Sequence, residues 1–479
     1  MLIGREASGA QAAVPGFGQV PAALLIGAVV LCACLVGIYT RPVDFLATVW
    51  PANAIMLGML LRFPATATPF GWGMAALGFL AADLLTGSPL FKTLILTAAN
   101  LVGVGGAYFL LRRYSRDTIR LKTPESIPLM VAAIGFGAFL AGLVGAVANP
   151  VLFGGSSLGG WSFWFVTEFA NYVAILPVML TARRVSLPKS ASRMDLLRVT
   201  LPALALVASC AISVQIGGPG AIAFPVPALL WSAIVYPRFL TVLLTSIFSF
   251  WSLLALSAGY FPNVVDVTTE SGLISMRLGV SLIALAPMML ASAMAKQKRL
   301  IGELSHLATH DTLSGVFNRG AFQEEAAAAI RSLNRSSQPF AALMIDIDHF
   351  KAINDRYGHA AGDQVIAIAA ARINACLRRN DIVGRVGGEE FAVLLSKCRR
   401  SEALEVAERI RSVFAQTMTL NDDAISLTVT LSVGLAASEG ASVDLDTLLE
   451  KADGALYRAK DLGRNRIEVH QTYCDEDAA

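Results

Sequence analysis

Charged residues are scarce in this chain. They make up 15% of its 479 residues, against 55% for hydrophobic residues, whereas an ordinary soluble domain carries about 25% charged residues. The scarcity is uneven: residues 1–295 hold 16 basic and 9 acidic side chains, and residues 296–479 hold 22 and 26. This distribution excludes a single soluble globular protein and a disordered chain. It predicts a multi-span membrane region followed by a charged, soluble domain.

Cysteine and clustered basic residues are also sparse. The six cysteines have no zinc-site spacing and suggest no disulfide framework. The net charge of +3 comes without a basic block, so we expect no nucleic-acid partner. The first 19 residues lack the apolar core of a signal peptide. We therefore expect a reduced soluble domain in the cytosol.

Apolar runs long enough to cross a bilayer, about 17–25 residues, recur from Val20 onward. Basic residues gather in the loops 112–127 and 183–198, whereas Asp266 and Glu270 lie in an acidic loop. The positive-inside rule then places both ends of the membrane region in the cytoplasm. Several runs are short or contain Gly and Pro, so we expect eight to ten spans. The ten segments are 20–39, 44–61, 68–84, 90–111, 128–153, 160–182, 199–216, 221–236, 239–257 and 274–295.

Polar side chains inside membrane spans are costly, so each is a candidate for a functional site. One interpretation is a ligand pocket or a proton-sensitive site, centred on Glu168 beside two tryptophans. The other is hydrogen bonding between helices. The residues concerned are Asn53, Asp83, Asn100, Glu168, Asn171 and Arg277.

Leucines continue at helical spacing after the last span, at Leu300, Leu304 and Leu307. We expect one continuous helix from the last span to about Leu307. Its apolar stripe is suited to a parallel coiled coil between two protomers, or it packs on its own domain.

The soluble domain alternates strand and helix patterns. We expect strands at 340–345 and 425–431, and helices at 363–379, 401–417 and 446–461. A hairpin signal spans 381–395, with two glycines at its turn. The pattern is that of an α+β domain with helices on a largely antiparallel sheet.

The candidate catalytic and metal-binding residues are clustered carboxylates. Asp346 and Asp348 end a strand, where residues two apart share a face, so both can point to one site. Glu389 and Glu390 follow Gly387-Gly388, where glycine allows φ > 0 and close approach of a ligand. Neighbouring acids are costly unless a cation neutralises them, and oxygen-only ligands favour Mg²⁺ or, as an alternative, Mn²⁺. Basic residues complete a pattern typical of metal-assisted phosphoryl transfer: Lys351, Lys460 and Arg464.

Two stretches resemble known families. Arg385-Val386-Gly387-Gly388-Glu389-Glu390-Phe391 resembles the signature of GGDEF-domain diguanylate cyclases, in the GGEEF form, and the likeness covers about 306–470 in five ordered blocks. Ser314 and Gly320 depart from the usual residues, at positions that are not catalytic in that family. Trp50-Pro51-Ala52-Asn53-Ala54 resembles the second span of MASE-type membrane sensor domains, over about 20–295.

The resemblance implies a palm-like, ferredoxin-variant fold related to nucleotide cyclases and polymerases, with GTP as substrate and cyclic di-GMP as product. It implies catalytic Glu389 and Glu390. The implied metal ligands are Asp346, Ile347 through its carbonyl, Glu389 and Glu390. The implied substrate-binding residues are Asn354, Asp363 and His359 for the base or ribose, and His349, Phe350, Lys351, Gly387, Gly388, Lys460 and Arg464 for the rest of the nucleotide.

An Arg-x-x-Asp pair lies five residues before the glycine turn. Arg378 and Asp381 match the inhibitory product site of the family, and Arg409 matches its secondary arginine. The alternative is that the arginines only complement a helix C-terminus. Two other functions stay open for the whole chain: an inactive GGDEF module that binds GTP or cyclic di-GMP, and a transporter with a regulatory nucleotide-binding tail.

The expected organisation is a multi-span α-helical membrane domain followed by the palm-like α+β domain. We expect a homodimer, joined through the linker and GGDEF domains, in the bacterial inner membrane among its lipids, with the GGDEF domain in the cytoplasm. The expected segments are a tail (1–19), the membrane sensor (20–295), a helical linker (296–309), the cyclase domain (310–470) and a second tail (471–479).

Overall fold

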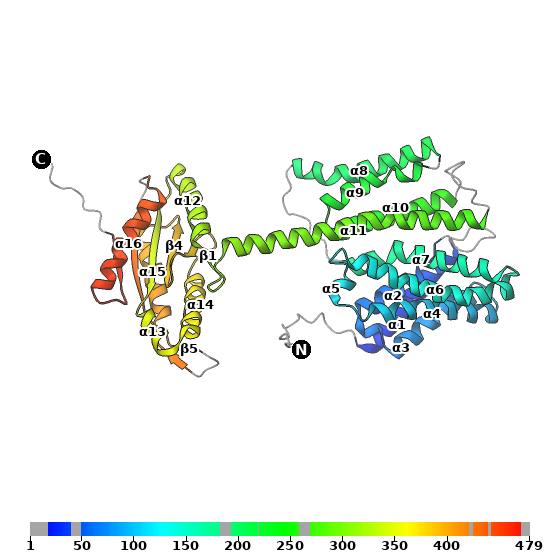
Figure 1. The fold of residues 1–479 in the computed structure, drawn as a ribbon, viewed down its shortest axis with the longest axis horizontal. Coiled ribbons are helices and arrows are strands. Elements are labelled where there is room, and N and C mark those ends of the chain that lie inside the picture. Colours follow the sequence, from blue (N-terminus) through cyan, green and yellow to red (C-terminus); the bar gives the residue numbers. More distant parts are fainter. Residues whose placement is uncertain are drawn as a thin grey trace. The chain divides into compact units, whose positions relative to one another are not determined.

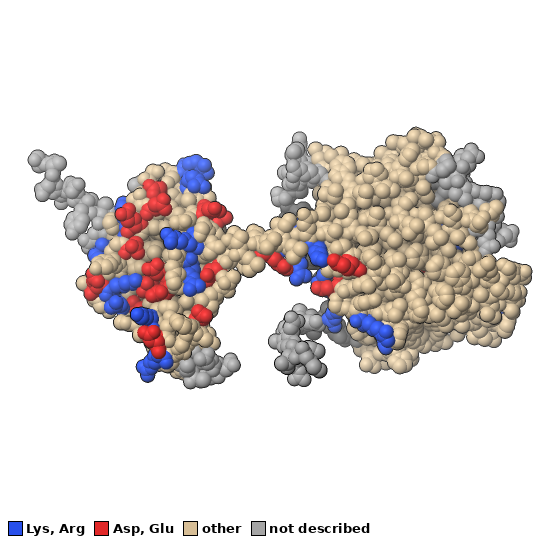
Figure 2. Space-filling view, in the orientation of Figure 1, with Lys and Arg blue, Asp and Glu red and all other residues tan. Residues whose placement is uncertain are grey.

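The computed structural model describes residues 18–39, 49–182, 193–218, 220–257, 269–420, 425–438 and 442–470. The chain divides into two compact units, Met1–Arg299 and Leu300–Ala479. Charged side chains crowd the surface of the second unit and are almost absent from the visible face of the first (Figure 2). Most of both predicted tails lies outside the described residues, as do much of the basic loop 183–198 and Asp266.

The first unit is built from apolar helices (Figure 1). Among the described residues, seven are long and apolar enough to cross a membrane, and each of the ten expected segments contains a helix. The bounds are α1 (Gln19–Tyr39), α2 (Ala52–Arg62), α3 (Pro69–Leu85), α4 (Leu90–Leu111), α5 (Arg116–Ile119), α6 (Ser126–Phe153), α7 (Ser157–Thr181), α8 (Arg193–Ile216), α9 (Val226–Val235), α10 (Arg238–Ser257) and α11 (Glu270–Thr309). Short 3₁₀ turns occupy Pro64–Thr66 and Ala221–Ala223.

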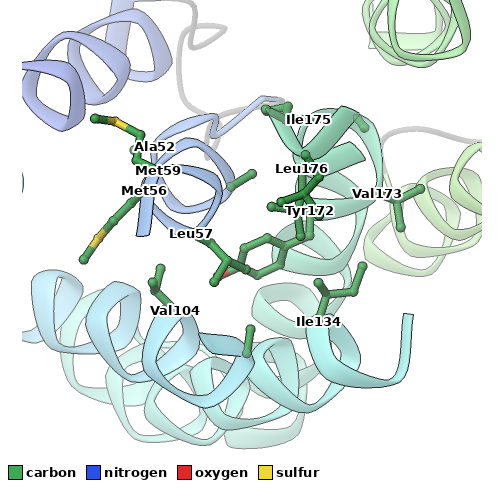
Figure 3. Close-up of a cluster of buried hydrophobic side chains, with 14 of the residues drawn as sticks. Ala52, Met56, Leu57, Met59, Val104, Ile134, Tyr172, Val173, Ile175 and Leu176 are labelled. Carbon is green, nitrogen blue, oxygen red and sulfur yellow. The ribbon is translucent and has the colours of Figure 1, made fainter. Parts of the chain in front are cut away.

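Three of the ten segments hold helices shorter than these seven. α3, with 17 residues, is at the lower limit of length for a span, and the other two are too short. α2 has 11 residues and α9 has 10, whereas about 20 residues are needed to cross the hydrocarbon core. Each helix starts directly after a proline, Pro51 and Pro225, which stands at its N-cap. Most of α2 is buried. It packs against α7, α4 and α1, and Figure 3 shows its Leu57 facing Tyr172 of α7. α2 is therefore an interior helix. Residues 44–48 lie outside the described residues, but α2 begins only after Pro51, so the expectation that residues 44–61 form a full span is wrong.

Small residues let the helices of this unit approach closely. A Cβ atom added to Gly137 on α6 would lie 2.5 Å from the carbonyl oxygen of Gly103 on α4. No larger residue fits at this crossing, which is the arrangement that small residues permit between membrane helices.

The last apolar segment and the linker form one helix, as predicted. α11 runs without interruption from Glu270 to Thr309. Leu300, Leu304 and Leu307 are 47%, 64% and 60% exposed on its final turns.

The second unit is a mixed sheet between two helical layers. Its sheet has the order β1-β3-β4-β2-β7-β8, with β5 and β6 paired separately. α13, α14 and α15 cover one face of the sheet, and α12 and α16 cover the other. The bounds are β1 (Phe317–Asn318), α12 (Arg319–Arg335), β2 (Phe340–Ile347), α13 (Phe350–Tyr357), α14 (His359–Ala375), β3 (Ile382–Arg385), β4 (Glu390–Ser396), α15 (Arg400–Phe414), β5 (Met418–Leu420), β6 (Ile425–Leu427), β7 (Leu431–Ser438), α16 (Leu445–Asp461) and β8 (Ile467–Val469).

The expected secondary structure is mostly found in this unit, with one error. The β-branched run 425–431 is not one strand: β6 ends at Leu427 and β7 begins at Leu431. β6 pairs with β5, whereas β7 pairs antiparallel with β2. Local β propensity does not reveal that neighbouring residues pair with different partners.

Candidate active site

Two acids lie side by side where the central strands meet. Asp346, near the end of β2, pairs with Glu390, the first residue of β4. Asp346 is 7% exposed, and its Oδ2 accepts an ion pair from Lys460 Nζ of α16 at 2.7 Å. Burial raises the pKa of Asp346 and the negative charges of Glu389 and Glu390 raise it further, whereas Lys460 acts in the opposite direction. A cation near Asp346 would therefore stabilise the ionised form of this carboxylate.

The glycine turn is fixed by short contacts. The amides of Val386 and Gly387 donate to the Glu390 carbonyl, at 3.0 and 3.4 Å. A Cβ atom on Gly387 would lie 2.3 Å from Oε2 of Glu390, so a side chain at this position would displace the carboxylate. Neither Gly387 nor Gly388 has a positive φ. The expectation of left-handed glycines is thus wrong, while close approach is the reason for glycine at 387.

Sequence reasoning missed one residue that positions this turn. Arg385 donates from Nη2 to the Gly388 carbonyl at 2.7 Å, and from Nη1 to Asp311 Oδ1 at 3.0 Å. Despite burial, hydrogen bonds from Ser314 and Arg385 lower the pKa of Asp311. The signal in the sequence was the place of Arg385 at the start of the Arg385–Phe391 signature, two residues before Gly387.

Asp348 does not join the acidic site. β2 ends at Ile347, so the alternation of the strand does not extend to this residue. Its carboxylate is 3% exposed and accepts from the Ser432 hydroxyl at 2.6 Å, the Thr430 hydroxyl at 2.7 Å and the Asn465 amide at 3.0 Å. The prediction that both acids point to one site is therefore wrong, because Asp348 anchors neighbouring loops.

The chain turns sharply after β2 and starts a helix. His349 has a φ of 56°, in the left-handed region, and α13 begins at Phe350. The first amides of a helix have no intrahelical partner and attract anions. The exposed side chain of Lys351 lies in the same turn. The N-terminal amides of α13 thus lie at this edge of the sheet, three residues after the end of the strand that carries Asp346.

The residues expected to read the base lie on adjoining helices. Asn354 of α13 packs against α14, since a Cβ on Gly362 would lie 1.9 Å from its Oδ1. Asp363 is the next residue, and both it and His359 are exposed in the first turns of α14. Asn354 is therefore brought beside the start of α14, where Asp363 lies.

The structure gives fewer contacts for the remaining predicted residues. Arg464 is exposed, with a φ of 64°. In the region of the expected product site, Asp381 accepts from the amides of Arg378 and Ser396, at 2.8 and 3.2 Å. Arg409 of α15 donates to the Cys376 carbonyl at 2.6 Å, at the C-terminal end of α14.

The acids do not form a complete metal cage by themselves. Within the described residues, no group of three or more His, Cys, Asp or Glu side chains is arranged to hold a metal ion. Mg²⁺ is usually held by one or two carboxylates together with substrate phosphates. The oxygen-only donors at this edge fit such an ion, with the nucleotide completing its coordination.

Comparison with known proteins covers both units. Residues 22–299 match the MASE1 family, and residues 308–466 match "Diguanylate cyclase, GGDEF domain". The chain is 30% identical over 446 residues to the probable diguanylate cyclase DgcF of Escherichia coli O157:H7, covering 91% of each chain. It is 39% identical over 176 residues to diguanylate cyclase DgcM of E. coli K12, covering 36% of this chain and 41% of that one.

Among solved structures, the GGDEF domain of DgcB from Caulobacter crescentus in complex with c-di-GMP is 33% identical. The match covers 34% of this chain and 94% of that one, with a TM-score of 0.33. Because the MASE1 match extends over more than half of the sequence and DgcF aligns along nearly its full length, the chain belongs to the diguanylate cyclase family in which a MASE1 domain precedes a GGDEF domain.

Proposed function

We propose that this chain condenses two GTP molecules into cyclic di-GMP and two pyrophosphates, with one GTP bound to each of two subunits. The observation that carries the proposal is the pairing of Asp346 with Glu390 beside the start of α13. Carboxylates suited to a metal and amides suited to phosphates thus lie at one edge of the sheet.

The metal would be Mg²⁺, or alternatively Mn²⁺, held by Asp346, the Ile347 carbonyl, Glu389 and Glu390. When bound, it would polarise the phosphate and lower the pKa of the attacking hydroxyl. Glu389 is the residue that we assign to accept the proton of the 3′-hydroxyl group. The negative charge around Asp346 supports a cation here, since Glu389 and Glu390 act on this carboxylate in addition to Lys460.

The rest of the nucleotide would be held by the neighbouring elements. The amides of His349 and Phe350, with Lys351, would bind the β- and γ-phosphates, together with Lys460 and Arg464. In that case Lys460 exchanges its contact with Asp346 for one with phosphate as the metal arrives. Asn354 and Asp363 would read the guanine edge, because an amide and a carboxylate match its acceptors and donors. His359 would line the base or ribose, and Gly387 and Gly388 would leave room for the nucleotide.

Synthesis requires two subunits, because each provides one GTP. The exposed leucines of α11 offer a surface for a second copy of the chain. Two such helices in a parallel coiled coil would bring two GGDEF domains together. Holding both nucleotides in line then supplies much of the rate.

We place the chain in the bacterial inner membrane, with the GGDEF domain in the cytoplasm where GTP is available. The membrane domain would regulate synthesis as a sensor. Product would inhibit by binding Arg378, Asp381 and Arg409. Both Asp381 oxygens already accept a backbone amide, and each keeps a second lone pair for a guanine donor.

The test is incubation of the purified full-length chain with GTP and Mg²⁺, followed by identification of the product by mass. We expect cyclic di-GMP from the wild type and none from Glu389→Ala, with circular dichroism showing that the variant is folded. Binding of GTP without turnover by the wild type would instead indicate an inactive receptor. Solute flux in proteoliposomes would indicate a transporter.

A further inference from the structure

A cluster of polar side chains lies inside the membrane unit. Asn53 of α2 donates Nδ2 to Oδ1 of Asn100 on α4, at 3.0 Å, and to Oε2 of Glu168 on α7, at 2.8 Å. Asn53 is 1% exposed and Glu168 is 5% exposed. Hydrogen bonding between helices therefore occurs at these residues, but it uses only some of their polar atoms.

Other polar atoms of the cluster have no partner. Within the described residues, Oδ1 of Asn53 and the hydroxyl of the fully buried Tyr172 form no hydrogen bond. Tyr172 follows Glu168 by one turn of α7, and Figure 3 shows its ring directed toward Leu57 of α2. Its hydroxyl lies 3.9 Å from the position of a Cβ on Gly103, one turn after Asn100. Buried polar atoms without partners are rare, and each calls for an explanation such as a bound water, a bound ion or a functional role.

The charge of the cluster is also unbalanced. Among the described residues, no cationic side chain forms an ion pair with Glu168. Arg277 of α11 donates to the hydroxyl of the adjacent Thr167 and not to Glu168. An isolated carboxylate within a membrane is costly unless a cation or a proton neutralises it.

We propose that Glu168, Asn53, Asn100 and Tyr172 form a binding site for a monovalent metal cation, Na⁺ or K⁺. Nδ2 of Asn53 now occupies the point between the oxygens of Asn100 and Glu168. A half-turn of the amide exchanges nitrogen for oxygen with no change of shape. It brings three oxygens, from Asn53, Asn100 and Glu168, close together, where a cation can bind between them. Carboxylate and carbonyl oxygens suit hard cations. One carboxylate balances a single positive charge, whereas a divalent ion would leave an excess charge in a low dielectric.

The test is the thermal unfolding of the full-length chain in detergent micelles, with NaCl or KCl replacing choline chloride at fixed pH and ionic strength. A ligand that binds only the folded state raises its unfolding midpoint. We expect a saturable rise of several degrees in the wild type and none in Glu168→Gln. The control is Glu125→Gln, which makes the same change in an exposed carboxylate that pairs with Lys296 at 2.9 Å and should keep the response.

A second variant covers the case in which Glu168→Gln does not fold. Tyr172→Phe removes the hydroxyl and keeps the ring, and it should weaken the apparent cation affinity several-fold. The proposal is overturned if neither Na⁺ nor K⁺ moves the wild-type midpoint, or if Glu168→Gln responds as the wild type does. A response to pH alone also overturns it, because a proton would then be the ligand. None of these outcomes depends on cyclase activity.

Discussion

Two acids that are separated by one residue should differ in what their removal affects: stability for Asp348 and activity for Asp346. Asp348 is a structural carboxylate with three hydrogen bonds, whereas Asp346 lies in the acidic site. We predict that Asp348→Ala destabilises the cyclase domain strongly. Asp346→Ala should abolish activity and leave stability nearly unchanged, because loss of the ion pair with Lys460 is offset by loss of the repulsion from Glu389 and Glu390.

The size of the Asp348 effect follows from its contacts. Hydrogen bonds to a charged acceptor contribute about 1.5–3 kcal/mol each, and bonds that share one acceptor are not additive. The Ser432 hydroxyl is fully buried and loses its acceptor in the variant. We therefore expect a loss of roughly 3–5 kcal/mol, in the range measured when a buried charged partner is removed. For a domain of this size, that loss lowers the unfolding temperature by roughly 10 °C.

The assay is the thermal unfolding of fragment 296–479, measured by circular dichroism, together with its cyclase activity. Asp348→Asn is the conservative control: it keeps one acceptor oxygen and should recover part of the lost stability. The assignment of the two acids is refuted if Asp348→Ala is as stable as the wild type. It is also refuted if Asp346→Ala loses as much stability as Asp348→Ala.

Three further predictions concern assembly, topology and feedback. Specific activity of fragment 296–479 should rise with protein concentration, and Leu304→Glu in the full chain should lower it by disrupting the exposed stripe; an active, proven monomer would contradict the two-subunit mechanism. A phosphatase reporter fused after Ala479 should be inactive in the cytoplasm, and periplasmic activity would overturn the topology. Arg378→Ala should continue synthesis as product accumulates, whereas the adjacent Arg379→Ala should be inhibited like the wild type. Progress curves with added product measure this, and equal inhibition of both variants argues against the site.

Much of the architecture could be predicted from the sequence because the signals are local. Long apolar runs locate helices by length and hydropathy alone, and the helix that continues to Thr309 was visible in its leucine spacing. The expected segments extended past Pro51 and Pro225, although these prolines mark where α2 and α9 begin. That α2 is interior depends on the helices around it, which no property of residues 52–62 reveals.

The candidate site was predicted in part for a similar reason. Strand alternation correctly places Asp346 but fails for Asp348, which lies one residue beyond the end of β2. The partners of Asp348 come from residues more than 80 positions away. The reason for Gly387 likewise depends on where the Glu390 side chain folds. Contacts of this kind arise only in three dimensions, so spacing in the sequence does not show them.

The two contacts of Arg385 have a mechanical consequence. Asp311 lies two residues after the end of α11, and Gly388 lies within the acidic turn, yet one guanidinium holds both. A guanidinium is planar and rigid, so its donors keep a fixed separation. A displacement at the end of α11 must therefore either break one of these bonds or pull on the Gly388 carbonyl. The side chain of Arg385 therefore connects the start of the cyclase domain directly to its acidic turn.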